Sequence, residues 1–444
     1  MIGIFLLLIA LYLYFKPKYR YISYFLYISF VTGNYGGFNL WTDSIVGFKQ
    51  SDCALIYSCV ILLYIVSTRN KIIPHIRELR FYKWFLLFLI LSFSFSIFYY
   101  GLTPYEVLQG GRHFFLVLML PILIRVKPDE FNKIIRMMMW MCFITSILYI
   151  GQVILKRPLM PNEYVSTDRG TGLLRFYNMP SNITFFLSLT FLYPEFYKRS
   201  ILNINIFRIV FIAAQTCTLG RTAIATCFLT VLLSMILQGS FKRFAKTIII
   251  LGIFLTPFIG TILQRFNNES TNNDIERVLN GDFNNNYELN GDATMLYRFA
   301  WIYERSSYLL TRPASEQFFG MGLCTESTDW PFEHYNFKIG LTDELGRVFQ
   351  LSTPDIAYGN LITFLGFGGA FIYLLMLINL TKIFWKNRQQ NAYITILTAM
   401  SLMFYLYAFS GSTLSNPKSF AIYFLGLSLI FHKTQENNKT SNEI

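Results

Sequence analysis

The sequence has little charge and many apolar side chains. Asp, Glu, Lys and Arg make up only 14% of its 444 residues, against about 25% in typical soluble domains. Hydrophobic residues make up 54%, and the mean hydropathy is +0.41. This balance excludes an ordinary soluble domain, which needs more polar surface than the chain offers.

The chain also lacks the residue patterns of common metal and cofactor sites. Its four histidines, His75, His113, His334 and His432, form no HxxxH pair, and no carboxylate cluster has metal-ligand spacing. Six cysteines without a CxxC pair give no disulfide framework. The Gly-Met-Gly at residues 320–322 stands alone, and P-loop, GxSxG and HExxH patterns are absent. We therefore predict no metal and no cofactor.

Long apolar runs dominate the chain instead. Each has roughly 15–25 residues, the length that crosses about 30 Å of hydrocarbon as a helix. A core without water requires backbone groups to pair inside their own segment, which favours helices. We predict an all-α polytopic membrane protein, a single integral membrane domain over residues 1–444 with about 13 transmembrane helices (12–14). They are predicted at roughly 2–15, 19–33, 51–67, 82–100, 105–125, 132–154, 179–196, 202–219, 222–238, 245–262, 357–381, 391–409 and 414–432.

Lys and Arg gather in alternate loops, and such loops are cytoplasmic in most membrane proteins. These loops are residues 16–20, 69–83, 125–133, 198–199, 242–246 and 382–388. The N-terminus is then external and the C-terminus cytoplasmic, which requires an odd number of helices. The same asymmetry accounts for the net charge of +13 without nucleic acid as a partner.

Two predicted external segments are longer than a simple turn, residues 156–178 and residues 263–356. The larger one carries seven basic and fourteen acidic residues, so it is acidic overall. Apolar residues recur at helical spacing over residues 293–310. This spacing predicts an amphipathic helix that lies along the outer membrane boundary or against the helix bundle.

Several arginines lie on the external side, where the charge asymmetry disfavours them. They are Arg112, Arg169, Arg175, Arg221 and Arg298. Each one by itself can extend to lipid headgroups or pair with a nearby acid. As a group they favour a shared outer cavity, because the planar guanidinium matches phosphate oxygens. We therefore predict a binding site for a phosphorylated, lipid-attached ligand.

Two further residues are candidates for proton transfer. Asp355 immediately precedes the predicted helix at 357–381, where it is either a helix N-cap or a general base at the membrane edge. His334 lies in the larger external segment and is either an ordinary surface residue or a substitute for that base. His113, next to Arg112, is expected to be a packed side chain.

Four segments, taken in order, resemble those of the bacterial O-antigen polymerase and O-antigen ligase superfamily. They are residues 169–182, with Arg169, Arg175 and a Pro-Ser-Asn before a helix; residues 216–223, with Arg221; residues 297–301 and then 319–322, with Arg298 and Trp301; and residues 355–369, which run from Asp355 into a Gly-containing helix. Residue 220 is Gly where the superfamily usually has Ser. The resemblance covers roughly residues 165–370.

The resemblance implies a multi-pass glycosyltransferase of the bacterial inner membrane, with a periplasmic N-terminus and large loop and a cytoplasmic C-terminus. Superfamily members act on undecaprenyl-pyrophosphate-linked glycans at the outer face of that membrane. Polymerases join repeat units of O-antigen or a similar surface polysaccharide, in lipopolysaccharide biosynthesis. Ligases transfer the finished polymer to lipid A core and carry a His where this chain has Asp355, so a polymerase is favoured.

The ligase stays an alternative, and so does a polytopic transporter or flippase of the same lipid-linked glycan. The expected partners are the donor and acceptor glycan lipids, membrane lipids and a chain-length regulator protein, with no nucleic acid. In the implied metal-independent transfer, Arg221, Arg298, Arg169 and Arg175 stabilise the departing pyrophosphate, with Arg112 beside them. Asp355 or His334 takes the proton of the acceptor hydroxyl.

Overall fold

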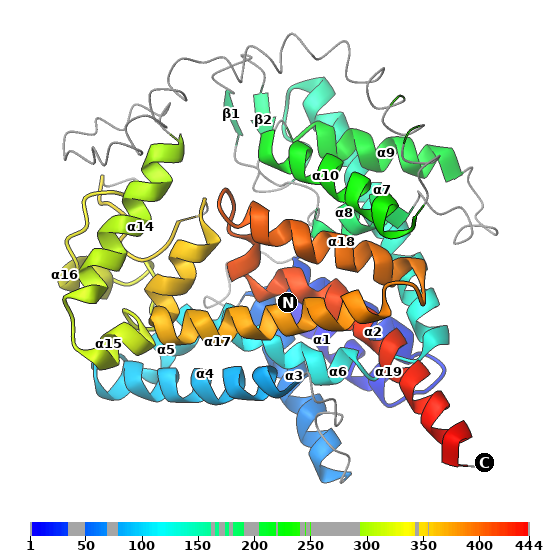
Figure 1. Ribbon diagram of the computed structural model, residues 1–444, viewed down its shortest axis with the longest axis horizontal. Coiled ribbons are helices and arrows are strands. Elements are labelled where there is room, and N and C mark those ends of the chain that lie inside the picture. Colours follow the sequence, from blue (N-terminus) through cyan, green and yellow to red (C-terminus); the bar gives the residue numbers. More distant parts are fainter. Residues whose placement is uncertain are drawn as a thin grey trace.

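The computed structural model describes residues 2–33, 49–68, 79–160, 165–167, 174–176, 181–190, 204–218, 221–239, 294–341, 346–353 and 355–442, with the single positions 245 and 249. Figure 1 shows these parts as a bundle of helices with one short pair of strands. The elements are α1 (Ile2–Tyr14), α2 (Arg20–Thr32), α3 (Gln50–Ser67), α4 (Arg80–Phe98), α5 (Pro104–Phe115), η3 (Leu116–Met119), α6 (Leu120–Leu123), α7 (Pro128–Leu155), β1 (Val165–Thr167), β2 (Leu174–Phe176), α8 (Asn182–Thr190), α9 (Ile204–Thr216), α10 (Arg221–Leu237), α14 (Thr294–Leu310), α15 (Ala314–Phe319), α16 (Trp330–His334), α17 (Ala357–Asn387), α18 (Ala392–Tyr407), η6 (Thr413–Ser415), η7 (Pro417–Phe420) and α19 (Ala421–Asn442).

Within the described residues, five helical segments are long and apolar enough to cross a membrane. They are α3, α4, the continuous run of α5, η3 and α6, α7, and α17. Shorter apolar helices lie at Gly3–Tyr14, Ala225–Leu237 and Ala392–Tyr407. The helical, membrane-embedded class is therefore confirmed. The predicted helix at 245–262 lies outside the described residues, and the total of about 13 crossings stays a prediction.

The last predicted helix begins later than the sequence suggested. We expected it at residues 414–432, but the chain first makes the 3₁₀ turns η6 and η7, and α19 starts at Ala421. Pro417 occupies the first position of η7, and the Asn416 side chain accepts a hydrogen bond from the Lys418 N–H at 3.2 Å. Asn and Pro at these two positions are typical of a helix start, so the apolar pattern alone placed the boundary too early.

Helix α17 lies at the centre of the bundle and packs against α4, α14, α15 and α18 (Figure 1). Glycines allow these close contacts. A Cβ at Gly369 would lie 2.1 Å from the ring of Phe88 on α4, and one at Gly359 would lie 2.5 Å from the Trp301 ring on α14. Small residues at these positions let α4 and α14 approach α17 closely.

The helix α17 is interrupted at Gly366, whose φ of 66° and ψ of −178° are not helical. The turn after α15 fills this break. Gly320, with φ of 83°, lies so close that a Cβ there would be 2.4 Å from the Gly366 nitrogen. The Met321 N–H donates to the Thr363 carbonyl at 2.8 Å. The turn after α15 thus supplies a hydrogen bond for a carbonyl beside the break.

Candidate functional site

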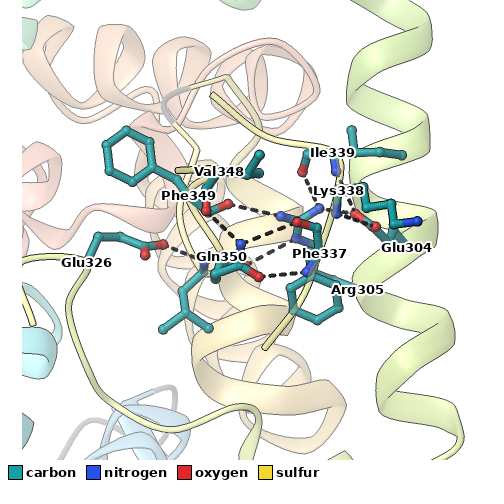
Figure 2. Close-up of polar contacts among 10 residues, drawn as sticks. Glu304, Arg305, Glu326, Phe337, Lys338, Ile339, Val348, Phe349 and Gln350 are labelled. Atoms are coloured by element: carbon teal, nitrogen blue, oxygen red, sulfur yellow. Dashed lines mark hydrogen bonds and ion pairs between the residues drawn. The ribbon is translucent and has the colours of Figure 1, made fainter. Parts of the chain in front are cut away.

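The predicted amphipathic helix is α14, and Arg305 on it organises the segments around it. Its side chain is 1% exposed. Nε donates to the Gln350 carbonyl at 3.3 Å and Nη2 to the Phe349 carbonyl at 3.1 Å, while Nη1 donates to the Ile339 carbonyl (Figure 2). The guanidinium also lies over the rings of Trp301 (4.3 Å) and Phe337 (4.5 Å). One buried cation therefore joins α14 to two stretches of irregular chain.

Glu304 and Gln350 complete this network. Glu304 pairs with Arg305 at 2.5 Å and accepts hydrogen bonds from the Lys338 N–H at 2.8 Å and the Ile339 N–H at 3.2 Å. The Gln350 side chain accepts from the Phe337 N–H at 2.7 Å and donates to the Val348 carbonyl at 2.6 Å (Figure 2). Side chains thus provide partners for backbone groups that have no strand or helix to pair with.

This network holds α14 beside the N-terminal part of α17 (Figure 1). Trp301 is fully buried against Gly359 of α17, which sets the rotation of α14 about its axis. Arg298 lies one turn earlier on the same helix. It is half-buried, and its Nε atom is buried with no hydrogen-bond partner in the part of the chain that the structure describes. A buried donor left in this state costs about 1–3 kcal/mol unless a ligand satisfies it.

Arg298 is brought together with two other predicted site residues at Tyr407. The charges of Arg298, Arg175 and Asp355 all act on the Tyr407 hydroxyl, which ends α18. The Ala357 N–H donates to the Ala408 carbonyl at 3.0 Å, which joins the start of α17 to the end of α18. We call Arg175, Arg298, Asp355 and Tyr407 the tyrosine-centred site.

Arg175 reaches this site from the short antiparallel pair of strands. It lies on β2, opposite Ser166 of β1. Its neighbour Phe176 is buried and accepts a hydrogen bond from the Tyr149 hydroxyl of α7 at 3.2 Å. Four separate parts of the chain therefore contribute to the tyrosine-centred site.

The carboxylate of Asp355 is not used to cap α17. Ile356 is the N-cap residue, and no side chain caps the helix there. The Asp355 N–H donates to the Thr353 hydroxyl at 3.3 Å. The N-cap interpretation of Asp355 is therefore wrong, because the helix begins one residue later than that role requires.

Tyr297, on α14 next to Arg298, lies between the site and the Arg305 network. Burial raises the pKa of Tyr297, the Thr353 hydroxyl opposes this shift, and the charge of Asp355 adds to it. Its phenol therefore stays protonated at neutral pH and is available as a hydrogen-bond donor near Asp355.

His334 has a different environment. It is exposed at the end of α16, stacks on the Trp330 ring at 4.0 Å, and has Nδ1 2.9 Å from the Trp330 carbonyl. No contact joins it to the four residues of the tyrosine-centred site within the described chain. This is the surface placement that the sequence left open as the alternative.

The remaining predicted arginines are placed as follows. Arg112 pairs with Asp52 of α3 at 3.5 Å and belongs to a separate group of charges. Its neighbour His113 is packed against Phe114 and Phe364. Arg221 is the first residue of α10, which packs along α18. Arg169 lies outside the described residues.

Sequence reasoning missed Tyr407, Tyr297 and Lys418. A tyrosine at a helix end carries no signal of its own, because tyrosines are common at membrane boundaries. Lys418 did carry a signal, since it lies near one end of the predicted helix at 414–432, where a charged side chain is disfavoured.

No group of three or more His, Cys, Asp and Glu side chains that could hold a metal ion occurs among the residues described here. No family model matches the chain, and no curated protein matches it.

Proposed function

We propose that the protein polymerises oligosaccharide repeat units carried on undecaprenyl pyrophosphate, at the outer face of the bacterial inner membrane. One observation supports this most: Arg175, Arg298 and Asp355, distant in sequence, all interact electrostatically with Tyr407 at the end of α18. The two cations can stabilise an anionic leaving group, and the carboxylate can accept a proton.

The proposed reaction is a glycosyl transfer. A hydroxyl of the acceptor sugar attacks the anomeric carbon of the donor chain, and a new C–O bond forms as the bond to pyrophosphate breaks. The electron pair leaves with the pyrophosphate oxygen, so that negative charge grows there. Asp355 takes the proton of the attacking hydroxyl. A positioned general base of this kind raises the reaction rate about 10²–10⁴-fold in other enzymes.

Arg298 and Arg175 stabilise the departing pyrophosphate in this scheme. The buried Nε of Arg298 needs an acceptor, and a phosphate oxygen is the acceptor that a guanidinium binds best. Arg221 and Arg169 are further members of the same cationic group in this proposal. The Tyr407 hydroxyl donates a hydrogen bond to the same pyrophosphate.

The topology belongs to the proposal as well. Thirteen crossings, with an external N-terminus and a cytoplasmic C-terminus, put the ends of α17 and α18 that carry the site at the outer face. A ligase of the same superfamily needs a histidine base. His334 is exposed and stacked on Trp330, so the placement of the side chains favours the polymerase.

The test uses a strain whose own copy is deleted, complemented with Arg298→Gln, Asp355→Asn or Arg347→Gln. Arg347 is the matched control, because it pairs with exposed Asp329 at 3.0 Å. The first two variants should reach the membrane at normal levels and lose long-chain polysaccharide by at least roughly 100-fold, as expected when a base or leaving-group cation is lost. The control should keep it.

Purified protein with a defined lipid-pyrophosphate oligosaccharide separates catalysis from export. Wild type should form ladders of repeat units, and Arg298→Lys should keep only part of the rate, because Lys lacks the planar fork. Normal chain lengths with both Arg298→Gln and Asp355→Asn would refute the site. Single-unit transfer to lipid A core without ladders would show the ligase instead.

A further inference from the structure

A second group of cations lies at the start of α3. Arg112 Nη1 is 3.5 Å from Asp52 Oδ2, and the two side chains are 16% and 24% exposed. The same carboxylate oxygen accepts a hydrogen bond from the Lys49 N–H at 2.7 Å. Asp52 is therefore shared between the arginine and the capped start of α3.

Lys418 joins this group from the connection between α18 and α19. It lies in η7, which packs against α5, the helix that carries Arg112, and against η3, which follows α5. Burial lowers the pKa of Lys418, and the nearby charges of Arg112 and Lys49 lower it further, while Asp52 opposes them. The packing of η7 on α5 thus brings the element that carries Lys418 against the element that carries Arg112.

The charges of this group do not balance. Lys49, Arg112 and Lys418 contribute three positive charges, and Asp52 is the one carboxylate that acts on Lys418 among the described residues. Arg112 and Lys418 are half-buried, whereas Lys49 is exposed. Half-buried like charges repel and lose hydration, so the Arg112–Lys418 pair lowers the stability of the empty protein. An arrangement of this kind is typical of a site that receives an anion, where the ligand supplies the missing negative charge.

We propose that Lys49, Arg112 and Lys418 form a second anion site, which takes a phosphate or diphosphate group. Its ligand's identity rests on the proposed function. A polymerase holds two lipid-linked glycans at once, and only the donor releases its pyrophosphate. The pyrophosphate of the acceptor keeps its charge throughout and needs a site of its own.

The position of the second site suits this role. The connection between α18 and α19 begins directly after Tyr407 of the first site, and its turn η7 contains Lys418 of the second. Tyr373 of α17 holds this connection by donating to the Leu414 carbonyl at 2.9 Å. One short, packed connection therefore links the two sites and limits the distance between the two anions.

The test measures binding to full-length protein in nanodiscs, with undecaprenyl pyrophosphate as a lipid probe and inorganic pyrophosphate as a soluble probe. The variants are Lys418→Met, Arg112→Gln and Arg298→Gln, and Lys382→Met is a matched control on an exposed lysine of α17. Lys418→Met should weaken binding of the lipid probe at one of two sites by at least tenfold. It should also raise the melting temperature of the ligand-free protein, because it removes like-charge repulsion.

The outcomes are distinct. A lower ligand-free melting temperature with two intact sites would show that Lys418 is only structural, and would overturn the proposal. Equal affinity for both probes would refute the assignment to a lipid. Loss of one site in Lys418→Met and of the other in Arg298→Gln would support it. If no repeat units are joined by wild type but Lys418→Met still loses a lipid site, the proposed function fails while the second site stands.

Discussion

Replacing Arg305 by Met should release the segment of residues 336–341 and 346–353 without unfolding the long apolar helices. The guanidinium is 1% exposed and donates to three backbone carbonyls and to Glu304. Met has a similar length and keeps the contact with the Trp301 ring, so the change removes the hydrogen bonds and leaves most of the packing. The three carbonyls and the Glu304 carboxylate lose their shared partner.

The expected loss follows from these contacts. A hydrogen bond to a charged donor contributes about 1.5–3 kcal/mol, and removing the guanidinium also removes its desolvation penalty. Breaking a buried ion pair by deleting one partner typically costs about 3–5 kcal/mol. Taking about 3 kcal/mol, the free energy of local opening falls enough to raise the open population roughly 100-fold.

Hydrogen exchange followed by mass spectrometry measures this population directly. Amides in residues 336–341 and 346–353 should exchange about 100-fold faster in Arg305→Met, while those in α4 should not change. Arg347→Met is the control, because its pair with Asp329 is exposed and contributes at most about 1 kcal/mol. Unchanged exchange around Phe337 and Gln350 in Arg305→Met would refute the view that this cation organises the segment.

Two further variants test other parts of the same region. Burial raises the pKa of Glu326, so the folded protein binds this proton more tightly than the unfolded chain. The contribution of Glu326 to the free energy of unfolding should be greatest below about pH 4.3 and fall as pH rises through the folded pKa. Glu326→Gln should therefore flatten that part of a profile of melting temperature against pH. A profile that keeps its slope in Glu326→Gln would show that another group titrates. Gly320→Ala should cost about 2–4 kcal/mol, since a Cβ would meet the Gly366 nitrogen at 2.4 Å, whereas Gly101→Ala, with a similar φ and open space, should cost only about 1–2 kcal/mol. Equal melting temperatures of these two variants in detergent would contradict this account of the α15 contact.

The helices could be predicted because a bilayer imposes a strong local constraint. An apolar run long enough to cross the membrane forms a helix whatever its partners, so α3, α4, α7 and α17 lie close to their predicted bounds. The start of α19 was misplaced because Asn416 and Pro417 act locally inside a run that is otherwise apolar. Hydropathy averages over such positions and cannot detect them.

The folded segment that Arg305 holds, residues 336–341 and 346–353, could not be predicted in the same way. Helical spacing correctly placed α14, but it does not tell which arginine on the helix is buried. Arg298 was chosen as one of the arginines on the predicted external side, whereas Arg305, seven positions later, is the side chain that holds the segment together. Its partners at 339, 349 and 350 are more than 30 residues away, and no local pattern encodes contacts at that distance.

The break at Gly366 has a consequence for how the protein is made. A carbonyl beside the break, that of Thr363, is satisfied by the N–H of Met321, which lies earlier in the chain than α17 itself. Lipid tails have no N–H or O–H that could replace this donor, and the hydrocarbon core holds no water that could do so. During synthesis the segment that contains Met321 is made before α17, so it must wait for α17 to form and then pack against it. The fold of this helix is therefore completed by chain made earlier, and a defect in that segment should appear as a late assembly failure.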